Sequence, residues 1–229
     1  MNRVVNVARM QLINKWTYLG IPAIILASAF LITYAIWALV PSDGGAMYSG
    51  AAQSVMWYFL ALGIMSMTQT FPFSQAMSVS RRTFYIGTVG LFAVVALAIS
   101  VLYYVLGLIE EATGGWGVNG QLYALGWLAD QPALVQIYFY FIAMVALFMI
   151  GFWFATIYKR WQATGMLVVW IAVAVVLLGL VALATWQGLW PEVGAWFVAQ
   201  TPLSVSAWAT VFCAALACGS YLTLRRATP

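Results

Sequence analysis

The residues of this chain that could take part in chemistry are few, and their types exclude most enzyme mechanisms. The sequence of 229 residues contains no histidine. This excludes haem ligation through imidazole, zinc sites built on histidine, and serine or cysteine catalysis with a histidine base. The two cysteines, Cys213 and Cys218, lack the spacing of a C-x-x-C motif and lie in one apolar run, so we expect small buried residues. We therefore predict no catalytic residue and no metal ligand.

A stripe of uncharged polar residues stands out within the apolar part of the sequence. Ser66, Gln69 and Thr70 are spaced at i, i+3 and i+4 and would share one face of a helix. In a membrane, such a face is more stable against another helix or beside a water-filled cavity than against lipid. The stripe therefore predicts either hydrogen bonds between helices or a possible translocation path.

The charged residues argue against ion-driven transport and against ATP hydrolysis by this chain. No charged residue falls inside a long apolar stretch, whereas proton- and ion-coupled transporters usually carry one there. The sequence also lacks G-x-x-x-x-G-K-[ST], the loop that holds ATP phosphates in many ATPases. Any work that the chain performs must be driven by another protein.

The composition predicts an all-helical protein embedded in a membrane. Apolar residues make up 65% of the chain and charged residues 6%, against about 25% charged in a soluble domain. A helix needs about 20 apolar residues to cross the hydrocarbon layer. Six charge-free stretches reach that length, namely residues 19–40, 51–71, 84–109, 133–157, 163–186 and 203–224.

The charges between these stretches are sorted by sign. The basic residues all fall on one side: Arg3, Arg9, Lys15, Arg81, Arg82, Lys159, Arg160, Arg225 and Arg226. The acidic residues fall in the alternate loops: Asp43, Glu110, Glu111, Asp130 and Glu192. Because Lys and Arg near span ends stay in the cytoplasm, both termini are predicted to be cytoplasmic. We expect six crossings of the inner or plasma membrane and no nucleic acid partner.

The segments outside the spans complete the expected layout. Residues 1–17 should form an N-terminal amphipathic arm on the inner surface, and residues 18–229 a six-helix transmembrane domain. In the arm, Val5, Ala8, Leu12 and Trp16 recur at helical spacing, although a frayed extension of the first span also fits. The apolar segment 190–202, bounded by two prolines, is too short to cross and predicts a shallow re-entrant or interfacial helix.

Two loops have local features of their own. Pro72 should interrupt the helix, so that Ser78 or Ser80 caps a new short helix on the cytoplasmic side; the arginines that follow could also be topology signals only. On the outer side, the loop 110–131 has a glycine-rich turn and then an apolar patch. We expect that patch to rest on the outer surface, and its members are Leu122, Tyr123, Leu125, Trp127 and Leu128.

This layout resembles the permease subunit of an ABC-2 type ATP-binding cassette transporter, in the small form common in bacteria. The shared features are the basic N-terminal arm, six spans with both ends inside, the run FPFSQAMSVSRRTFYIGT at residues 71–88, and the short segment before the last span. The Ser-Arg-Arg-Thr-Phe part of that run, which enters the third span, is the most family-like local signal.

The resemblance implies a division of labour between subunits. In that family a coupling helix between spans two and three docks on a separate ATPase subunit, where ATP and Mg are bound, so this chain would need no cofactor. The coupling residues would be Ser78, Ser80, Arg81 and Arg82, with a lesser contact by Lys159 and Arg160. Two permeases, identical or related, would work with two ATPases and export a hydrophobic or amphipathic substrate.

A function of another class also fits the sequence. The chain could be a scaffold or an immunity-type membrane subunit that transports nothing and binds a partner through the aromatic residues of its outer loop.

Overall fold

The computed structural model describes residues 3–40 and 45–225 of the chain, and most of them are helical. The first half contains α1 (Arg3–Leu12), the π-helical turn η1 (Trp16–Gly20), α2 (Ile21–Leu39), α3 (Gln53–Met65), η2 (Ser66–Thr70), α4 (Phe71–Ala76) and α5 (Arg81–Ala112). The second half contains the turn η3 (Gly115–Asn119), α6 (Gly126–Ala129), α7 (Ala133–Trp186), α8 (Trp190–Val198) and α9 (Pro202–Leu224). The short strands β1 (Met47–Tyr48) and β2 (Gly120–Gln121) pair in parallel. The predicted all-α class is confirmed.

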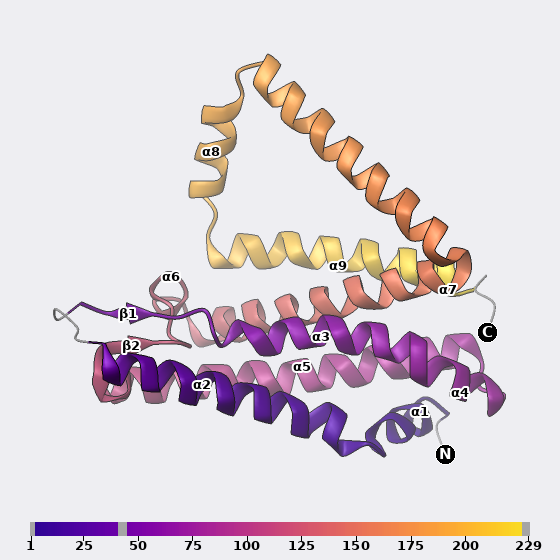
Figure 1. Cartoon of the computed structure of the whole chain (residues 1–229), viewed down its shortest axis with the longest axis horizontal. Helices are drawn as coiled ribbons and strands as arrows, with labels where there is room; N and C mark the ends of the chain where they lie inside the picture. Colours follow the sequence, from indigo (N-terminus) through magenta and orange to yellow (C-terminus); the bar gives the residue numbers. More distant parts are fainter. Residues whose placement is uncertain (1–2, 41–44, 226–229) are drawn as a thin grey trace.

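Five helical segments form a bundle along the long axis of the molecule. They are α2, α3, α5, the first half of α7, and α9 (Figure 1). Helices α3 and α7 touch through their backbones: a Cβ atom on Gly63 would lie 2.2 Å from the carbonyl oxygen of Phe148, and one on Gly151 2.1 Å from that of Leu60. Beside this contact, Phe92 of α5 stacks on Phe148 with 4.1 Å between ring centroids. Small residues allow this close packing, which holds helices together in lipid.

Helix α7 is two helices joined by a reversal. Its 54 residues would measure about 81 Å if straight, far more than the hydrocarbon layer is thick. The backbone of Gln162 has φ 56° and ψ −153°, which is not helical, and the chain turns back there. The second half leaves the bundle and forms a triangle with α8 and α9 (Figure 1). The reversal falls between the two stretches that the sequence predicts.

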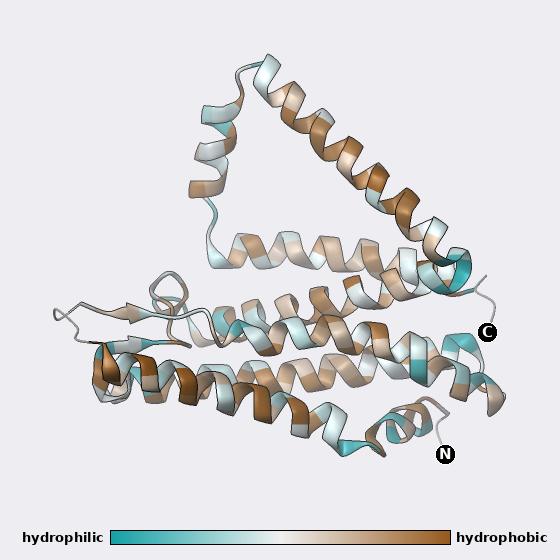
Figure 2. Cartoon of the chain, in the orientation of Figure 1, coloured by the Kyte–Doolittle hydropathy of each residue, from teal (hydrophilic) through white to brown (hydrophobic). Residues whose placement is uncertain are grey.

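Four described helical segments are long and apolar enough to cross a membrane. They are Trp16–Leu39, Arg81–Ala112, Ala133–Trp186 and Pro202–Leu224. The predicted stretch 51–71 lies mostly in α3, whose helical path continues through η2 into α4. Figure 2 shows that α2 and the second half of α7 are covered mainly by apolar residues. All six predicted stretches are thus largely helical, and the number of crossings stays a prediction.

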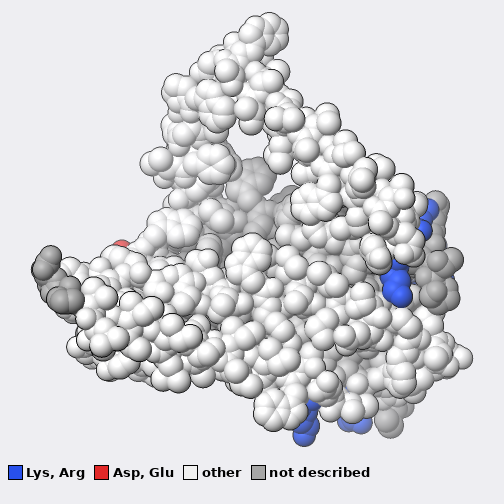
Figure 3. All heavy atoms as spheres, in the orientation of Figure 1, with Lys and Arg blue, Asp and Glu red and all other residues white. Residues whose placement is uncertain are grey.

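The described charges gather at opposite ends of the molecule. Arg81, Arg160 and Arg225 lie together at what we call the basic end. Glu110 and Glu111 lie at the other end, here the acidic end. On the face shown in Figure 3, blue atoms lie near the reversal of α7 and along the lower edge near α1 and the start of α2, and the red ones near β1 and α6. Two further charges of the predicted pattern, Asp43 and Arg226, lie outside the described residues.

The segment before the last helix runs across the bundle axis. It forms α8, which has no buried residue and is oriented across α9 (Figure 1). Helix α9 begins with Pro202 in its first turn and a capping box, in which Thr201 Oγ1 accepts from the Ser204 N–H at 3.2 Å. The predicted short helix is present, and its re-entrant position stays a prediction.

Candidate functional site

At the basic end, α1 packs against α5, so the N-terminal arm is part of the folded domain. Val7 is buried beside Gly87, where a Cβ atom would lie 2.9 Å from the Val7 side chain. Gln11 is also buried, and its Nε2 donates to Thr88 Oγ1 at 2.6 Å. The missing side chain at Gly87 creates the space that Val7 fills, and the hydrogen bond fixes the register. The arm is therefore held by specific contacts.

The face of α1 that packs against α5 is not the apolar stripe predicted from the sequence. Val5 is exposed and Trp16 is 70% exposed, while Ala8 and Leu12 are half-buried. Helix α1 ends at Leu12, so Trp16 belongs to the next helical segment and does not continue the phase of α1. A single periodic stripe across residues 5–16 is therefore wrong, because the helix is interrupted within it.

The connection between α3 and α5 contains a short helix, but it begins earlier than predicted. Helix α4 begins at Phe71 with Pro72 in its first turn, where the missing N–H of proline removes no helical hydrogen bond. Ser80 caps α5: its Oγ accepts from the Thr83 N–H at 3.2 Å. Ser80 thus caps a helix, as predicted, but that helix is the long α5, and the short helix α4 precedes both serines. Ser78 instead occupies the left-handed turn before α5, with φ 56°.

A groove separates α1 from the turn that connects α4 with α5. It has a volume of about 360 Å³ and is lined by Asn6, Val7, Met10, Met77, Ser78, Val79, Ser80 and Thr83. The structure therefore brings two predicted coupling residues, Ser78 and Ser80, to one surface with the N-terminal arm. The sequence alone did not link the arm with this turn.

The two adjacent arginines of the predicted coupling segment have different surroundings. Arg81 is half-buried, and its Nη1 donates to the carbonyl oxygens of Arg225 at 2.7 Å and Leu224 at 3.4 Å. It thus caps the last turn of α9, whose carbonyl groups lack helical partners. Arg82 is exposed. Only Arg82 of the pair points to the surroundings of the chain.

The other predicted contact residues lie at the reversal of α7. The Arg160 guanidinium lies over the Trp161 ring at 4.1 Å, and Lys159 is half-buried. Arg160 lines a second hollow of about 410 Å³ together with Leu222, Thr223 and Arg225. The structure therefore brings Arg160 near the end of α9 and places it in a different hollow from Ser78 and Ser80.

The polar stripe is split between different surroundings. Ser66 is buried, and its Oγ donates to the Leu62 carbonyl oxygen of its own helix at 2.8 Å. Gln69 is exposed and Thr70 is half-buried. The three residues lie in the π-helical turn η2, whose wider winding rotates them away from one α-helical face. A translocation path along these side chains stays a prediction.

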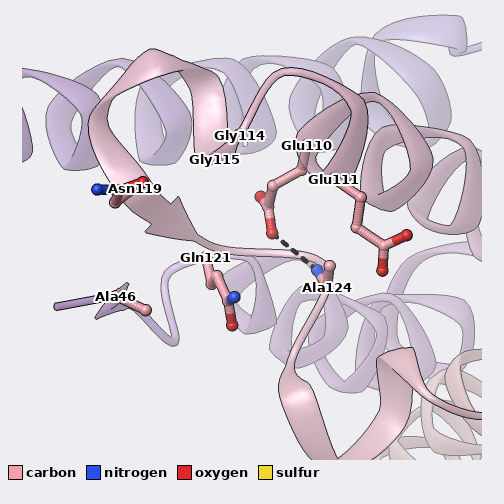
Figure 4. Close-up of a pocket in the computed structure, with 8 residues that line it drawn as sticks. All are labelled: Ala46, Glu110, Glu111, Gly114, Gly115, Asn119, Gln121 and Ala124. Carbon is pink, nitrogen blue, oxygen red and sulfur yellow. Dashed lines mark hydrogen bonds between the residues drawn. The ribbon is translucent and has the colours of Figure 1, made fainter. Parts of the chain in front are cut away.

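At the acidic end, Glu110 holds the outer loop in place. Its side chain is 1% exposed, and its carboxylate accepts from Trp116 Nε1 at 2.7 Å and from the backbone N–H groups of Leu122 at 3.0 Å and Tyr123 at 3.2 Å. It also accepts from the backbone N–H of Ala124 at 2.9 Å (Figure 4). Successive N–H groups that converge in this way form an anion-binding cradle. The neighbouring Glu111 is exposed and takes no part in it.

The loop that Glu110 holds folds back against the helix bundle. Gly114, Gly115 and Gly117 have φ values of 62°, 71° and 77°, which permit the tight turn. Gly120 then lies against Trp37, where a Cβ atom would come within 2.2 Å of the indole ring. The loop covers a hollow of about 420 Å³ beside both glutamates.

The apolar patch of this loop is mostly buried, so the expectation that it rests on the outer surface is wrong. Leu122, Tyr123 and Leu128 are buried, and Trp127 remains exposed. Burial, with a smaller contribution from the charge of Glu110, raises the pKa of Tyr123 to about 12. Its hydroxyl therefore stays protonated at neutral pH. The sequence signal that could have found this arrangement is a span-ending acid followed by glycines and an apolar run.

No protein-family model, curated protein or solved structure matches this chain.

Proposed function

We propose that this chain is the permease subunit of an ABC-2 type ATP-binding cassette transporter. The six helical stretches are its six crossings, and the basic end faces the cytoplasm. It pairs with a second permease and with separate ATPase subunits, which bind ATP and Mg. It exports a hydrophobic or amphipathic compound and catalyses no reaction itself.

The observation that carries this proposal is the groove between α1 and the α4–α5 turn. An ATPase outside the membrane can act on the spans only through the ends that face it. At the basic end, the groove is lined by the hydroxyl-bearing residues Ser78 and Ser80 and by the apolar residues Val7 and Met10. Arg82 is exposed just after it. This combination of polar, apolar and cationic groups fits a protein partner.

Helix α5 provides a mechanical route from this groove to the opposite end. Ser80 caps its first turn, and α1 is fixed to it through Val7 and Gln11. The helix has 32 residues, about 48 Å, and Glu110 lies near its last turn. A displacement of the groove by ATP-driven closure would therefore reach the loop at the acidic end along one rigid element.

A charge reversal at Arg82 tests the docking role. Arg82→Glu should weaken association with the ATPase subunit, and its stimulation, by about tenfold, because an exposed charge at an interface affects partner binding more than folding. Arg82→Lys should retain most of the effect. Copurification from membranes and ATPase assays of the resulting complex provide the measurement.

Arg81 serves as the matched comparison within the same segment. Arg81→Glu should lower the thermal unfolding midpoint, because it removes the cap of α9, whereas Arg82→Glu should leave the midpoint unchanged. Full ATPase stimulation by the Arg82→Glu chain would contradict the docking assignment.

The scaffold or immunity-type function has less structural support. It requires the aromatic residues of the outer loop to face a partner, but Tyr123 is buried and the indole N–H of Trp116 donates to Glu110. Trp127 is the exposed aromatic residue of that loop. Purification in mild detergent separates the two functions, since a stoichiometric P-loop subunit supports the permease and an isolated monomer supports the alternative.

A further inference from the structure

An aromatic hollow lies at the acidic end, away from the groove described above. Its volume is about 380 Å³, within the range of small-molecule sites, and three separate elements contribute to it. Trp127 comes from α6, Trp196 from α8 and Trp208 from α9. The ring centroids of Trp196 and Trp208 are 6.4 Å apart with an angle of 59° between their planes. All three indoles are about half exposed.

The charges around this hollow have one sign. Glu192 precedes Trp196 by four residues on α8, so the two side chains lie one helical turn apart. Asp130 follows Trp127 by three residues. Both carboxylates are exposed, and α6, α8 and α9 contain no Lys or Arg. The two carboxylates are not part of the lining, but each is within four residues of a lining tryptophan, so the charge close to the hollow along α6 and α8 is negative.

The polar side chain in the lining is already engaged. Gln200 Nε2 donates to the Trp196 carbonyl oxygen at 3.1 Å, and its Oε1 accepts from Ser204 Oγ at 2.7 Å. The attraction available to a ligand thus comes from apolar contact, the negative faces of the indole rings and the nearby carboxylates.

We propose that this hollow binds a soluble organic cation with an apolar body, such as a quaternary ammonium compound. Tryptophan faces and flanking carboxylates both favour positive charge, and quaternary ammonium groups give up their water easily and fit between aromatic rings. An anion would be repelled by Glu192 and Asp130, and a neutral compound would gain apolar contact alone. This is a statement about binding; that the ligand is also the exported compound rests on the proposed function.

Equilibrium dialysis of the full chain in dodecyl maltoside tests the proposal, with labelled benzyltrimethylammonium as the probe. The probe should bind, and neopentylbenzene, which has the same shape without the charge, should compete at least about tenfold less well. Equal competition by the neutral compound would overturn the proposal. Displacement by dihexanoylphosphatidylcholine at lower concentration than by unlabelled probe would assign the hollow to a lipid headgroup and also overturn it.

Variants of the tryptophans distinguish attraction by an aromatic ring from apolar contact with a side chain of any kind. Trp208→Leu and Trp196→Leu should each weaken probe binding by about tenfold, whereas Trp208→Phe should weaken it by about threefold or less. Trp186→Leu is the control, because Trp186 is 86% exposed and does not line the hollow. Equal losses for Leu and Phe at position 208 would contradict a cation site. Failure here leaves the Arg82 test of ATPase docking unaffected, since the two sites lie at opposite ends.

Discussion

Glu110 illustrates what burial does to a single charged residue in this molecule. By sequence it is one of five acids that mark the outer side, which is the same information that Glu111 provides. In the structure the two differ completely, because Glu110 accepts four N–H groups and Glu111 is exposed. The cradle depends on amides 12 to 14 residues away, so the acid, glycine and apolar run of the sequence could suggest a contact here but could not separate the role of Glu110 from that of Glu111.

Replacing Glu110 with Gln should loosen the outer loop. Glutamine keeps the size but has one acceptor oxygen, and its NH2 group would face the amides that the carboxylate now binds. A buried donor without a partner costs about 1–3 kcal/mol, so the amides of residues 122–124 should exchange hydrogen about tenfold faster or more. Hydrogen exchange followed by mass spectrometry measures this. Glu111→Gln should leave the exchange unchanged, and unchanged exchange in both variants would contradict the conclusion that Glu110 holds the outer loop in place.

The arginine pair shows a similar limit of sequence reasoning. The resemblance assigns Arg81 and Arg82 the same role, since both follow the coupling segment. Their roles separate only because α9 ends beside the first turn of α5, although Arg81 and Arg225 are 144 positions apart in the sequence. Long-range contacts of this kind follow from helix packing and not from spacing.

The sequence predicts a helix correctly where the length of an apolar run determines it. It misses the features of helices that depend on packing against neighbouring helices. Stretch 84–109 lies within α5, and stretch 203–224 nearly coincides with α9, because a long run of apolar residues leaves few alternatives to a helix in lipid. The π-helical turns, the end of α1 at Leu12 and the start of α4 at Phe71 were not foreseen. Each depends on how a helix fits its neighbours.

The contact between α3 and α7 allows a direct test of packing. Gly151→Ala would place a methyl group 2.1 Å from the Leu60 carbonyl oxygen, so the helices must move apart. We expect a loss of about 1–3 kcal/mol in the free energy of unfolding, measured by chemical denaturation in detergent.

Gly179 lies in the same helix and supplies the control. A Cβ atom there would meet no atom within 4 Å, so Gly179→Ala should cause no loss, and the higher helix propensity of alanine should stabilise by roughly 0.5–1 kcal/mol. If Gly151→Ala were as stable as Gly179→Ala, the backbone contact would be wrong.

At the scale of the whole molecule, the second half of α7 distinguishes six crossings from four. It is apolar, exposed along its length and separated from the bundle by the reversal at Gln162. Surface of this kind is stable only against lipid or against another apolar chain, such as the second permease of the proposed dimer. After the reversal, the second half of α7 runs away from the basic end and α8 follows it. Helix α9 then runs back, so that both ends of the described chain lie at the basic end.

Single cysteines can determine whether this return crosses the membrane. In a chain with Cys213 and Cys218 replaced by Ser, Gln187→Cys lies just after α7, and Ala112→Cys ends α5. A membrane-impermeant maleimide applied to intact cells should label both, whereas Ser78→Cys at the basic end should react only after permeabilisation. Labelling of Ala112→Cys with protection of Gln187→Cys would mean that the second half of α7 does not cross. Helix α9 would then begin on the cytoplasmic side, and if it crossed the membrane it would place Arg225 outside, against the sorting of the charges.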